Sequence, residues 1–269
     1  MVKTFVLLML VLGLPLTSAG EKITVKQGKP ETVKRVVVDD FSSYKPQSFP
    51  KFDNNYRWHI FSLTNFKTQN YWVEEEQGNR FLRAEIKKTL PAKKKSMTLI
   101  RRFRKAGHTG RDTAAVSDDN GGFYHVQEYP YLSWKWGVLQ FPQGGDERDA
   151  EKNDSAAGVY VYFQKKGQLP KVIKYIWSST LSVGTQILSP SSRDGYDIYF
   201  IVVKSGAAPS SGWAQEVRDV YKDYLRCFNN EQPPRVVGIG VLTDADSTDT
   251  EASADYDDFI FLSALEQKP

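Results

Sequence analysis

The sequence predicts a mainly β fold, a two-sheet antiparallel β-sandwich with one amphipathic α-helix. Short runs of alternating apolar and polar residues recur along the chain, and this is the period of strands with one buried face. Helical spacing of apolar residues is convincing in a single segment. The chain also has 14 Tyr and 6 Trp, more amphipathic rings than a core alone requires. We therefore expect an aromatic core between two sheets, and further rings on a binding surface.

The centre of the predicted sandwich is the stretch 129–163. The run 131–140 alternates, and its large apolar residues share one face: Leu132, Trp134, Trp136 and Val138. Two tryptophans on one face bury a large area, so we place this strand inside a sheet and assign both rings to the core. After an acidic loop, a second strand at 159–163 carries Tyr160 and Tyr162 on one face.

Nine further runs read as strands. They are 35–41, 58–61, 71–76, 81–87, 97–103, 171–178, 196–203, 236–242 and 259–262. Residues 77–80, Gln-Gly-Asn-Arg, read as a hairpin turn. The run 196–203 is apolar almost throughout, which indicates burial on both faces of its sheet.

One amphipathic helix is predicted at about 211–228. From Trp213 onward, apolar residues recur at helical spacing: Val217, Val220, Tyr221, Tyr224 and Phe228. Ser211 is a suitable N-cap, and Pro233-Pro234 prevents the helix from continuing.

The first 19 residues read as a bacterial, Sec-type signal peptide. Lys3 supplies the positive charge, residues 5–12 form the apolar run, and small residues precede a cleavage site expected after Ala19. This run is shorter than the roughly 20 residues that span a bilayer, and no second apolar segment of membrane length follows. We expect a leader over 20–34, one sandwich domain over 35–265, and a mature protein that is periplasmic or secreted.

Composition narrows the possible functions. Cys227 is the single cysteine, which excludes an intrachain disulfide. The formal net charge of +4 is too small to indicate a nucleic-acid partner. The sequence contains no H-E-x-x-H, G-x-S-x-G or G-x-G-x-x-G motif. Acid pairs are plentiful, so glycoside hydrolysis by two carboxylates stays open.

The loop 141–155 carries five acidic residues: Asp146, Glu147, Asp149, Glu151 and Asp154. Such carboxylates ligate Ca²⁺ or accept hydrogen bonds from sugar hydroxyls, but basic residues interleave them, which favours a solvated loop for its middle part. Asp154 differs because it lies at the start of an aromatic strand. A fixed position there favours either function or a structural hydrogen bond.

A second acidic run extends over 244–258. Asp244-Ala-Asp246 is similar to the opening of a calcium loop, but the glycine and closing glutamate of an EF-hand are missing. A looser oxygen-ligated site and a turn capped by Asp side chains both remain open.

Two acidic pairs near the ends of the predicted domain suggest a second place for a cation. Asp39-Asp40-Phe41 near the start is echoed by Asp257-Asp258-Phe259 near the end. If the first and last strands pair, these four carboxylates converge on a structural metal site, with Ca²⁺ as the candidate ion. The alternative is that the echo of a short string is a coincidence.

Several Trp-rich motifs occur in order: Leu132-Ser-Trp134-Lys-Trp136, Gly145-Asp146-Glu147, Asn153-Asp154, Val159-Tyr-Val161-Tyr-Phe163, Tyr175-Ile-Trp177-Ser, and segments within 213–223, 243–248 and 254–258. Together they resemble the bacterial domain of unknown function DUF3047 over roughly 36–262. The resemblance implies a jelly-roll-like sandwich similar to carbohydrate-binding modules, with no catalytic residue to carry over. It also leads us to expect an arginine where Gly158 stands, so this chain departs from the family's pattern there.

We expect a non-enzymatic protein that binds a carbohydrate or a cell-envelope component. The candidate ligand-binding residues are Trp177 and Tyr160 or Tyr162 as stacking platforms, Asp146 and Asp154 as hydroxyl acceptors, and Arg218 as a positioning group. Asp244 and Asp246 are further ligand-binding candidates. A polysaccharide hydrolase or lyase with paired carboxylates and a structural envelope protein are the alternatives.

Overall fold

The structure is a computed structural model, and it describes residues 32–50, 58–60, 70–91, 94–103, 124–164, 167–192, 196–207 and 212–265. The chain divides into two units, Met1–Thr32 and Val33–Pro269, and the fold is that of the second unit. The predicted signal peptide and nearly all of the leader lie outside the described residues. Within the described part of the chain, no helix is both long and apolar enough to cross a bilayer.

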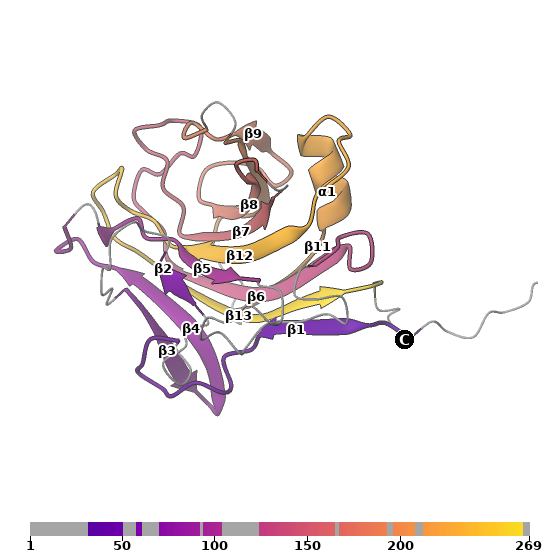
Figure 1. Ribbon diagram of the computed structural model, residues 1–269. Helices are drawn as coiled ribbons and strands as arrows, with labels where there is room; N and C mark the ends of the chain where they lie inside the picture. Colours follow the sequence, from indigo (N-terminus) through magenta and orange to yellow (C-terminus); the bar gives the residue numbers. More distant parts are fainter. Residues whose placement is uncertain are drawn as a thin grey trace, which may run out of the picture. The chain divides into compact units, whose positions relative to one another are not determined.

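The described strands form two sheets that face each other (Figure 1). The six-stranded sheet has the order β11 (Ala214–Asp219), β6 (Tyr131–Gln140), β13 (Ala252–Leu262), β4 (Asn79–Ile86) and β3 (Tyr71–Glu76), and β1 (Arg35–Asp39) also pairs with β13. The seven-stranded sheet has the order β2 (His59–Ile60), β5 (Leu99–Arg102), β12 (Val236–Leu242), β7 (Ala157–Phe163), β8 (Lys171–Ser178), β10 (Ile198–Ser205) and β9 (Gln186–Leu188). The predicted β-sandwich is confirmed. One detail differs, because β8 and β10 are parallel where the prediction was antiparallel throughout.

Aromatic rings join the two sheets. Trp134 and Trp136 of β6 are fully buried and cross the gap to β8, as predicted for the core. The ring centroid of Trp134 lies 5.4 Å from that of Tyr175, and the centroid of Trp136 lies 5.6 Å from that of Trp177. Offset contacts at these distances add to the stabilisation from area burial alone.

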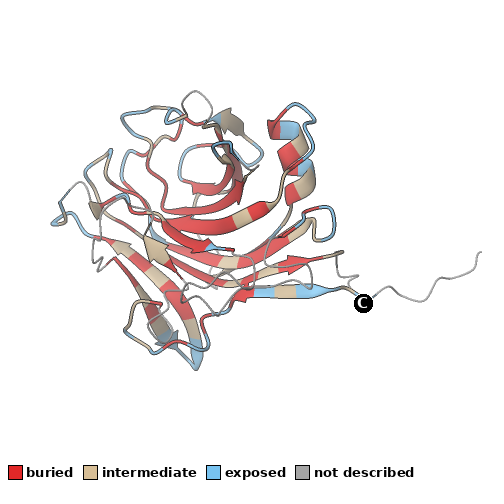
Figure 2. Cartoon of the chain, viewed as in Figure 1, coloured by how far each residue is buried: buried red, intermediate tan, exposed pale blue. Residues whose placement is uncertain are grey.

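The seven-stranded sheet is buried on both faces. β7 and β12 are buried along almost their whole length in Figure 2. Alternate residues of β10 confirm the prediction for this run, because Ile201 and Val203 enter the core between the sheets while Phe200 and Val202 join a second apolar cluster. The strands from β7 to β9 curve round (Figure 1), and the second cluster lies on the face away from the six-stranded sheet. We call this the concave face. Its residues on the central strands are Gly158, Tyr160 and Tyr162 of β7, Val172, Lys174 and Ile176 of β8, and Ile198, Phe200 and Val202 of β10.

The predicted helix is shorter than expected. Helix α1 (Val220–Cys227) begins at an Asp219 N-cap, whose side chain accepts a hydrogen bond from the Lys222 amide. The residues before it form strand β11 instead, with Val217 exposed and Glu216 buried. The prediction was wrong there because Trp213 and Val217 continue the helical spacing by chance, while the inward-facing residue of the strand is charged. Ser211 lies outside the described residues. Burial raises the pKa of the Cys227 thiol to about 12.

Strand β13 is longer than predicted and serves two partners. Its first half, within the acidic run that reads as loop, pairs with β4, and its second half pairs with β1. The strand bends at Asp258, where φ is 52°, and the register against β6 shifts between Asp257 and Ile260. The acidic residues there are held by protein groups: Arg83 pairs with Asp255, and Asn79 Nδ2 donates to Asp257 at 3.0 Å. Acidic residues that the sequence suggests are a solvated loop thus form a strand, because their carboxylates are buried and paired.

The bend in β13 predicts a pH dependence of stability. Burial of Asp257, with a contribution from the charge of Asp258, raises the pKa of Asp257 to about 7, whereas an unfolded Asp titrates near pH 4. Between these values the folded protein binds more protons than the unfolded chain, so stability falls as pH rises through the window and is level above it. In Asp257→Asn this component is lost, and urea unfolding should show a flatter stability profile from about pH 4 to 7.

The control for this prediction is Asp40→Asn, which alters an exposed carboxylate that caps Ser42. In this variant the free energy of unfolding should fall with pH as steeply as in the wild type between about pH 4 and 7. An Asp257→Asn profile that parallels the wild type would contradict the prediction.

Candidate functional site

The candidate site lies where the start of β7 meets the end of β12. These strands are antiparallel neighbours, and Gly158 lies opposite Leu242. Beyond this pair, the Asp244 amide donates to the Ser155 carbonyl at 3.1 Å. The register brings together carboxylates from both acidic segments: Asp154, Asp244 and Asp246, each with one oxygen within 4.8 Å of those of the others.

Tyr256 of β13 fixes this junction from the opposite sheet. Its hydroxyl donates to the Leu242 carbonyl at 3.0 Å and lies 2.9 Å from Thr243 Oγ1. The Gly158 amide donates to the same hydroxyl at 3.4 Å. Because these groups are buried, the hydrogen bonds hold the ends of β7 and β12 at a defined position over the core.

Asp154 connects the two acidic segments. The residue is 1% exposed, and its carboxylate accepts hydrogen bonds from the amides of Ser247 at 3.2 Å and Thr248 at 2.7 Å. Thr248 Oγ1 donates to it as well, at 2.7 Å. These contacts hold the chain after β12 against the start of β7.

Asp244 is the most unusual member of the group. It is 5% exposed, and its Oδ1 atom is buried with no hydrogen-bond partner among the described residues. Burial raises the pKa of Asp244 well above its usual range. The charge of Lys174 opposes this shift, whereas the charges of Asp246 and Asp154 add to it. Asp246 is the most exposed of the three carboxylates.

Lys174 is a buried cation on the concave face. Its Nζ atom donates to Ser155 Oγ at 2.8 Å and lies about 5 Å from two ring centroids, at 5.3 Å from Tyr160 and 5.0 Å from Phe200. Gly158 leaves room for it, because a Cβ atom there would lie 2.5 Å from Lys174 Cε. Burial lowers the pKa of Lys174, and the charges of Asp244, Glu147, Asp154 and Asp246 oppose that shift.

Glu147 adds a third buried carboxylate near Lys174, after Asp154 and Asp244. It is 1% exposed and accepts a hydrogen bond from Ser178 Oγ at 2.8 Å. Burial raises the pKa of Glu147. Its neighbour Asp146, a predicted hydroxyl acceptor, instead pairs with Arg148, whose hydrogen bonds lower the pKa of Asp146 to about 2.

The predicted stacking platforms are wrong. Trp177 is 1% exposed in the core between the sheets, and its Nε1 donates to the Gly206 carbonyl. Tyr160 and Tyr162 lie on the concave face but are only 8% and 7% exposed. Their rings stack on each other with centroids 5.8 Å apart. The alternation gave the correct faces, but it could not show that both faces of this sheet are covered.

Arg218 is not brought to the carboxylate group by any described contact. It lies on β11 in the other sheet, where its guanidinium forms hydrogen bonds with Asp223 at 2.9 to 3.1 Å. Its Cζ atom lies 5.6 Å from the ring centroid of Tyr175. The assigned role of Arg218 as a positioning group is therefore not supported by its contacts, which tie α1 and β11 to the core.

The predicted metal site at the chain ends is also wrong. The first and last strands do pair, β1 with β13, but the four carboxylates of Asp39, Asp40, Asp257 and Asp258 do not form a group that could share an ion among the described residues. Each has its own partner: Asp39 accepts from Tyr44 Oη and Trp58 Nε1, Asp40 from Ser42, Asp257 from Asn79, and Asp258 pairs with Lys135. The echo of the two strings is a coincidence.

Sequence reasoning missed Lys174 and gave Glu147 no specific role. Lys174 had a usable signal, since it is a charged residue in the middle of the otherwise apolar run 172–177. Glu147 had none, because it is one of several acids in a mixed-charge loop.

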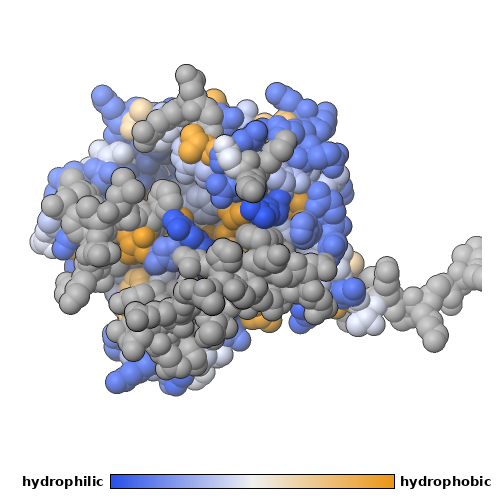
Figure 3. All heavy atoms as spheres, viewed as in Figure 1, coloured by the Kyte–Doolittle hydropathy of each residue, from blue (hydrophilic) through white to orange (hydrophobic). Residues whose placement is uncertain are grey.

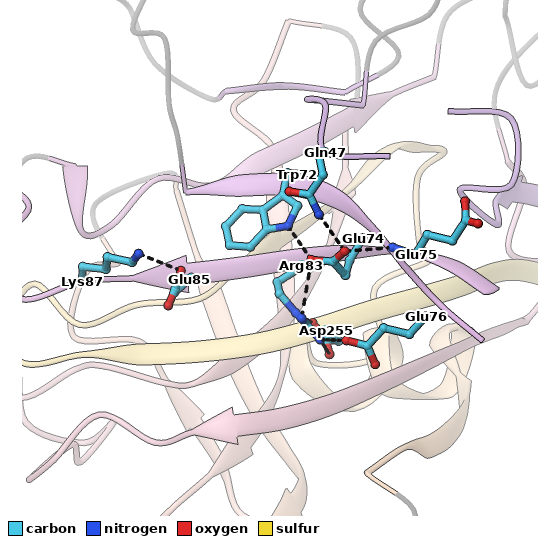
Figure 4. Close-up of polar contacts among 9 residues, drawn as sticks. All are labelled: Gln47, Trp72, Glu74, Glu75, Glu76, Arg83, Glu85, Lys87 and Asp255. Atoms are coloured by element: carbon cyan, nitrogen blue, oxygen red, sulfur yellow. Dashed lines mark hydrogen bonds and ion pairs between the residues drawn. The ribbon is translucent and has the colours of Figure 1, made fainter. Parts of the chain in front are cut away.

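A second polar cluster, on β3, β4 and β13, differs in character (Figure 4). Arg83 forms two hydrogen bonds with Asp255 and one with Glu76, and Glu74 accepts from Trp72 Nε1 and Gln47 Nε2. The guanidinium of Arg83 forms ion pairs with three acids there, Glu74, Glu76 and Asp255. Lys174, by contrast, forms no ion pair with the carboxylates near it among the described residues.

Comparison with known proteins gives one family. A family model described as "Protein of unknown function (DUF3047)" matches residues 121–260. No curated protein matches the chain.

Among solved structures, a family 12 glycoside hydrolase matches at 9% identity and a TM-score of 0.40, over 77% of this chain and 100% of the hydrolase. The family 30 carbohydrate-binding module of a Clostridium thermocellum cellulosomal cellulase matches at 9% identity and 0.38, over 87% and 99%. A mutant ENZbleach xylanase matches at 8% identity and 0.38, over 82% and 91%. Likeness this weak does not bear on what this chain binds.

Lys174 should contribute strongly to stability. Lys174→Met removes the buried ammonium that donates to Ser155 Oγ, and a hydrogen bond from a charged group contributes about 1.5 to 3 kcal/mol. Urea unfolding at neutral pH measures this loss.

Lys171→Met is the matched control on the same strand. Lys171 pairs with half-exposed Glu231, so its loss should cost less than about 1 kcal/mol. Equal losses in the two variants would show that the buried ammonium has no special role.

Proposed function

We propose that this chain, which belongs to the DUF3047 family of unknown function, binds a carbohydrate or another hydroxyl-rich component of the cell envelope without catalysis. One observation carries the proposal. Three carboxylates from two distant segments converge at the end of β7 and β12, and one of them, Asp246, extends toward solvent. The carboxylate of Asp246 can accept hydrogen bonds from sugar hydroxyls at the surface, whereas Asp154 and Asp244 are buried within the fold.

The surroundings of the group support recognition of a polar ligand. Asp154 is held by three hydrogen bonds, so its position does not depend on a ligand. Lys174 lies close to the carboxylates, and its charge opposes the rise that burial causes in the pKa of Asp244. A rigid first layer of acceptors lowers the entropic cost of binding.

The hydrolase or lyase alternative makes a different geometric demand. Glycosidases place two carboxyl groups about 5 to 10 Å apart on opposite sides of the substrate. The oxygens of Asp154, Asp244 and Asp246 instead gather within 4.8 Å of one another, and two of the three residues are buried. A group with one accessible carboxylate favours binding over hydrolysis.

The structural-protein alternative predicts a large apolar patch. On the face shown in Figure 3, the described residues are mostly hydrophilic, and apolar residues appear as small separate areas. The exposed large apolar residues also come from separate elements, such as Val37 on β1, Leu188 on β9 and Val217 on β11. This distribution favours a soluble ligand over a packing partner.

The place of action in this proposal is outside the cytoplasm. It rests on the charged start, apolar run and small residues of the first 19 positions. Periplasmic or secreted protein would meet envelope and environmental polysaccharides directly. The intact mass of protein recovered from outside the cytoplasm tests this, with cleavage after Ala19 as the expected result.

Glycan-array screening followed by calorimetry tests the binding proposal. The protein should bind at least one envelope or plant polysaccharide, and Asp246→Asn should weaken that binding about tenfold, because the acceptor loses its charge and the hydrogen bond to it weakens. Asp246 is partly exposed, so the variant should fold normally.

Trp72→Ala is the control on the other sheet, where the indole is half-buried beside Glu74. It should leave affinity unchanged. Loss of binding in Trp72→Ala but not in Asp246→Asn would move the site to β3, and the absence of any glycan ligand would overturn the proposal.

A further inference from the structure

We infer that Asp154, Asp244 and Asp246 bind a Ca²⁺ ion. One carboxylate oxygen of each residue lies within 4.8 Å of the others, which is the spacing of ligands around one shared cation. The inference concerns the carboxylates of the proposed function but stands independently of it, because Ca²⁺ binding is measured with no carbohydrate present.

The buried oxygen of Asp244 points to a missing ligand. Asp244 Oδ1 has no hydrogen-bond partner among the described residues, although the residue is only 5% exposed. A buried carboxylate oxygen without a donor is costly, and native proteins satisfy such groups with water or an ion. The two nearest carboxylates, Asp154 and Asp246, are acceptors when they are ionised, so a cation shared by the three residues would satisfy this oxygen.

Lys174 does not fill this role. Its Nζ donates to Ser155 Oγ and lies over the rings of Tyr160 and Phe200. None of the ion pairs among the described residues joins Lys174 to these three carboxylates. One ammonium also balances only one of the three negative charges when all are ionised.

The ligand set fits Ca²⁺ better than other common divalent ions. All three ligands are oxygens, which favours Ca²⁺ or Mg²⁺ over zinc, for which Cys and His are the usual ligands. Ca²⁺ takes 6 to 8 oxygens in flexible geometry, whereas Mg²⁺ requires near-ideal octahedral geometry and retains several waters. The segment after Asp246 supplies further oxygens in Ser247, Thr248 and Thr250.

The same arrangement leaves part of the coordination sphere accessible. Asp154 and Asp244 are buried, whereas Asp246 is more exposed. A Ca²⁺ ion held by all three would therefore face solvent on the side of Asp246. Water or the hydroxyls of a sugar can complete its coordination there.

Calorimetric titration of the chelator-treated, dialysed full protein with CaCl₂ tests the inference. We expect saturable binding at one site and a rise in the thermal unfolding midpoint with Ca²⁺ concentration. Asp244→Asn and Asp246→Asn should each lower the affinity at least about tenfold. Asp246 is the most exposed of the three carboxylates, so its variant reports binding even if Asp244→Asn unfolds.

Glu251→Gln is the matched control, because it removes one charge from the same segment and keeps the acceptor for the Lys88 amide. It should bind Ca²⁺ as the wild type does. Absence of Ca²⁺ binding by the wild type, unchanged binding in both Asp variants, or a stronger response to Mg²⁺ than to Ca²⁺ would overturn the inference. If the protein binds Ca²⁺ normally but binds no glycan, only the proposed function would be overturned.

Discussion

The layer of aromatic rings between β6 and β8 is the constraint on which the rest of the molecule depends. Trp134 meets Tyr175 and Trp136 meets Trp177 across the gap between the sheets. Because side chains alternate along a strand, burying Tyr175 and Trp177 inward forces Lys174 to the opposite face of β8. The charged interior of the concave face is thus a consequence of how the core is packed. A shift of β8 by one residue would exchange an ammonium for a large ring in both places.

The carboxylate group depends on a second constraint, the pairing of β7 with β12. These strands are far apart in sequence, and the acidic segments that flank them meet only because Gly158 lies opposite Leu242. The hydroxyl of Tyr256 then fixes that junction from the other sheet. The site therefore belongs to the whole sandwich, since its position requires β7, β12 and β13 together. Its three acids all lie in connections between strands, but the paired strands beside them fix where those connections meet.

Much of the fold follows from the sequence, but the site follows only in part. Strands β6, β8 and β12 have the bounds that alternation predicts, because large apolar residues define their buried faces. The first half of β13 was not predicted, because its Asp255 is buried and paired with Arg83. That pairing depends on contacts between residues distant in the sequence. Asp154, Asp244 and Asp246 could be named from carboxylate chemistry, yet their convergence depends on strand pairing. The prediction of surface rings was wrong for the same reason, since no local pattern shows whether other parts of the chain cover a face of the sheet.

Gly158 determines where the Lys174 side chain can lie. A side chain at 158 and the Lys174 side chain compete for one volume, because a Cβ atom at 158 would lie 2.5 Å from Lys174 Cε. Any side chain at 158 therefore requires the end of the Lys174 side chain to move away from this position. The absence of a side chain on β7 is thus what gives the ammonium on β8 its place next to Ser155 and the two rings.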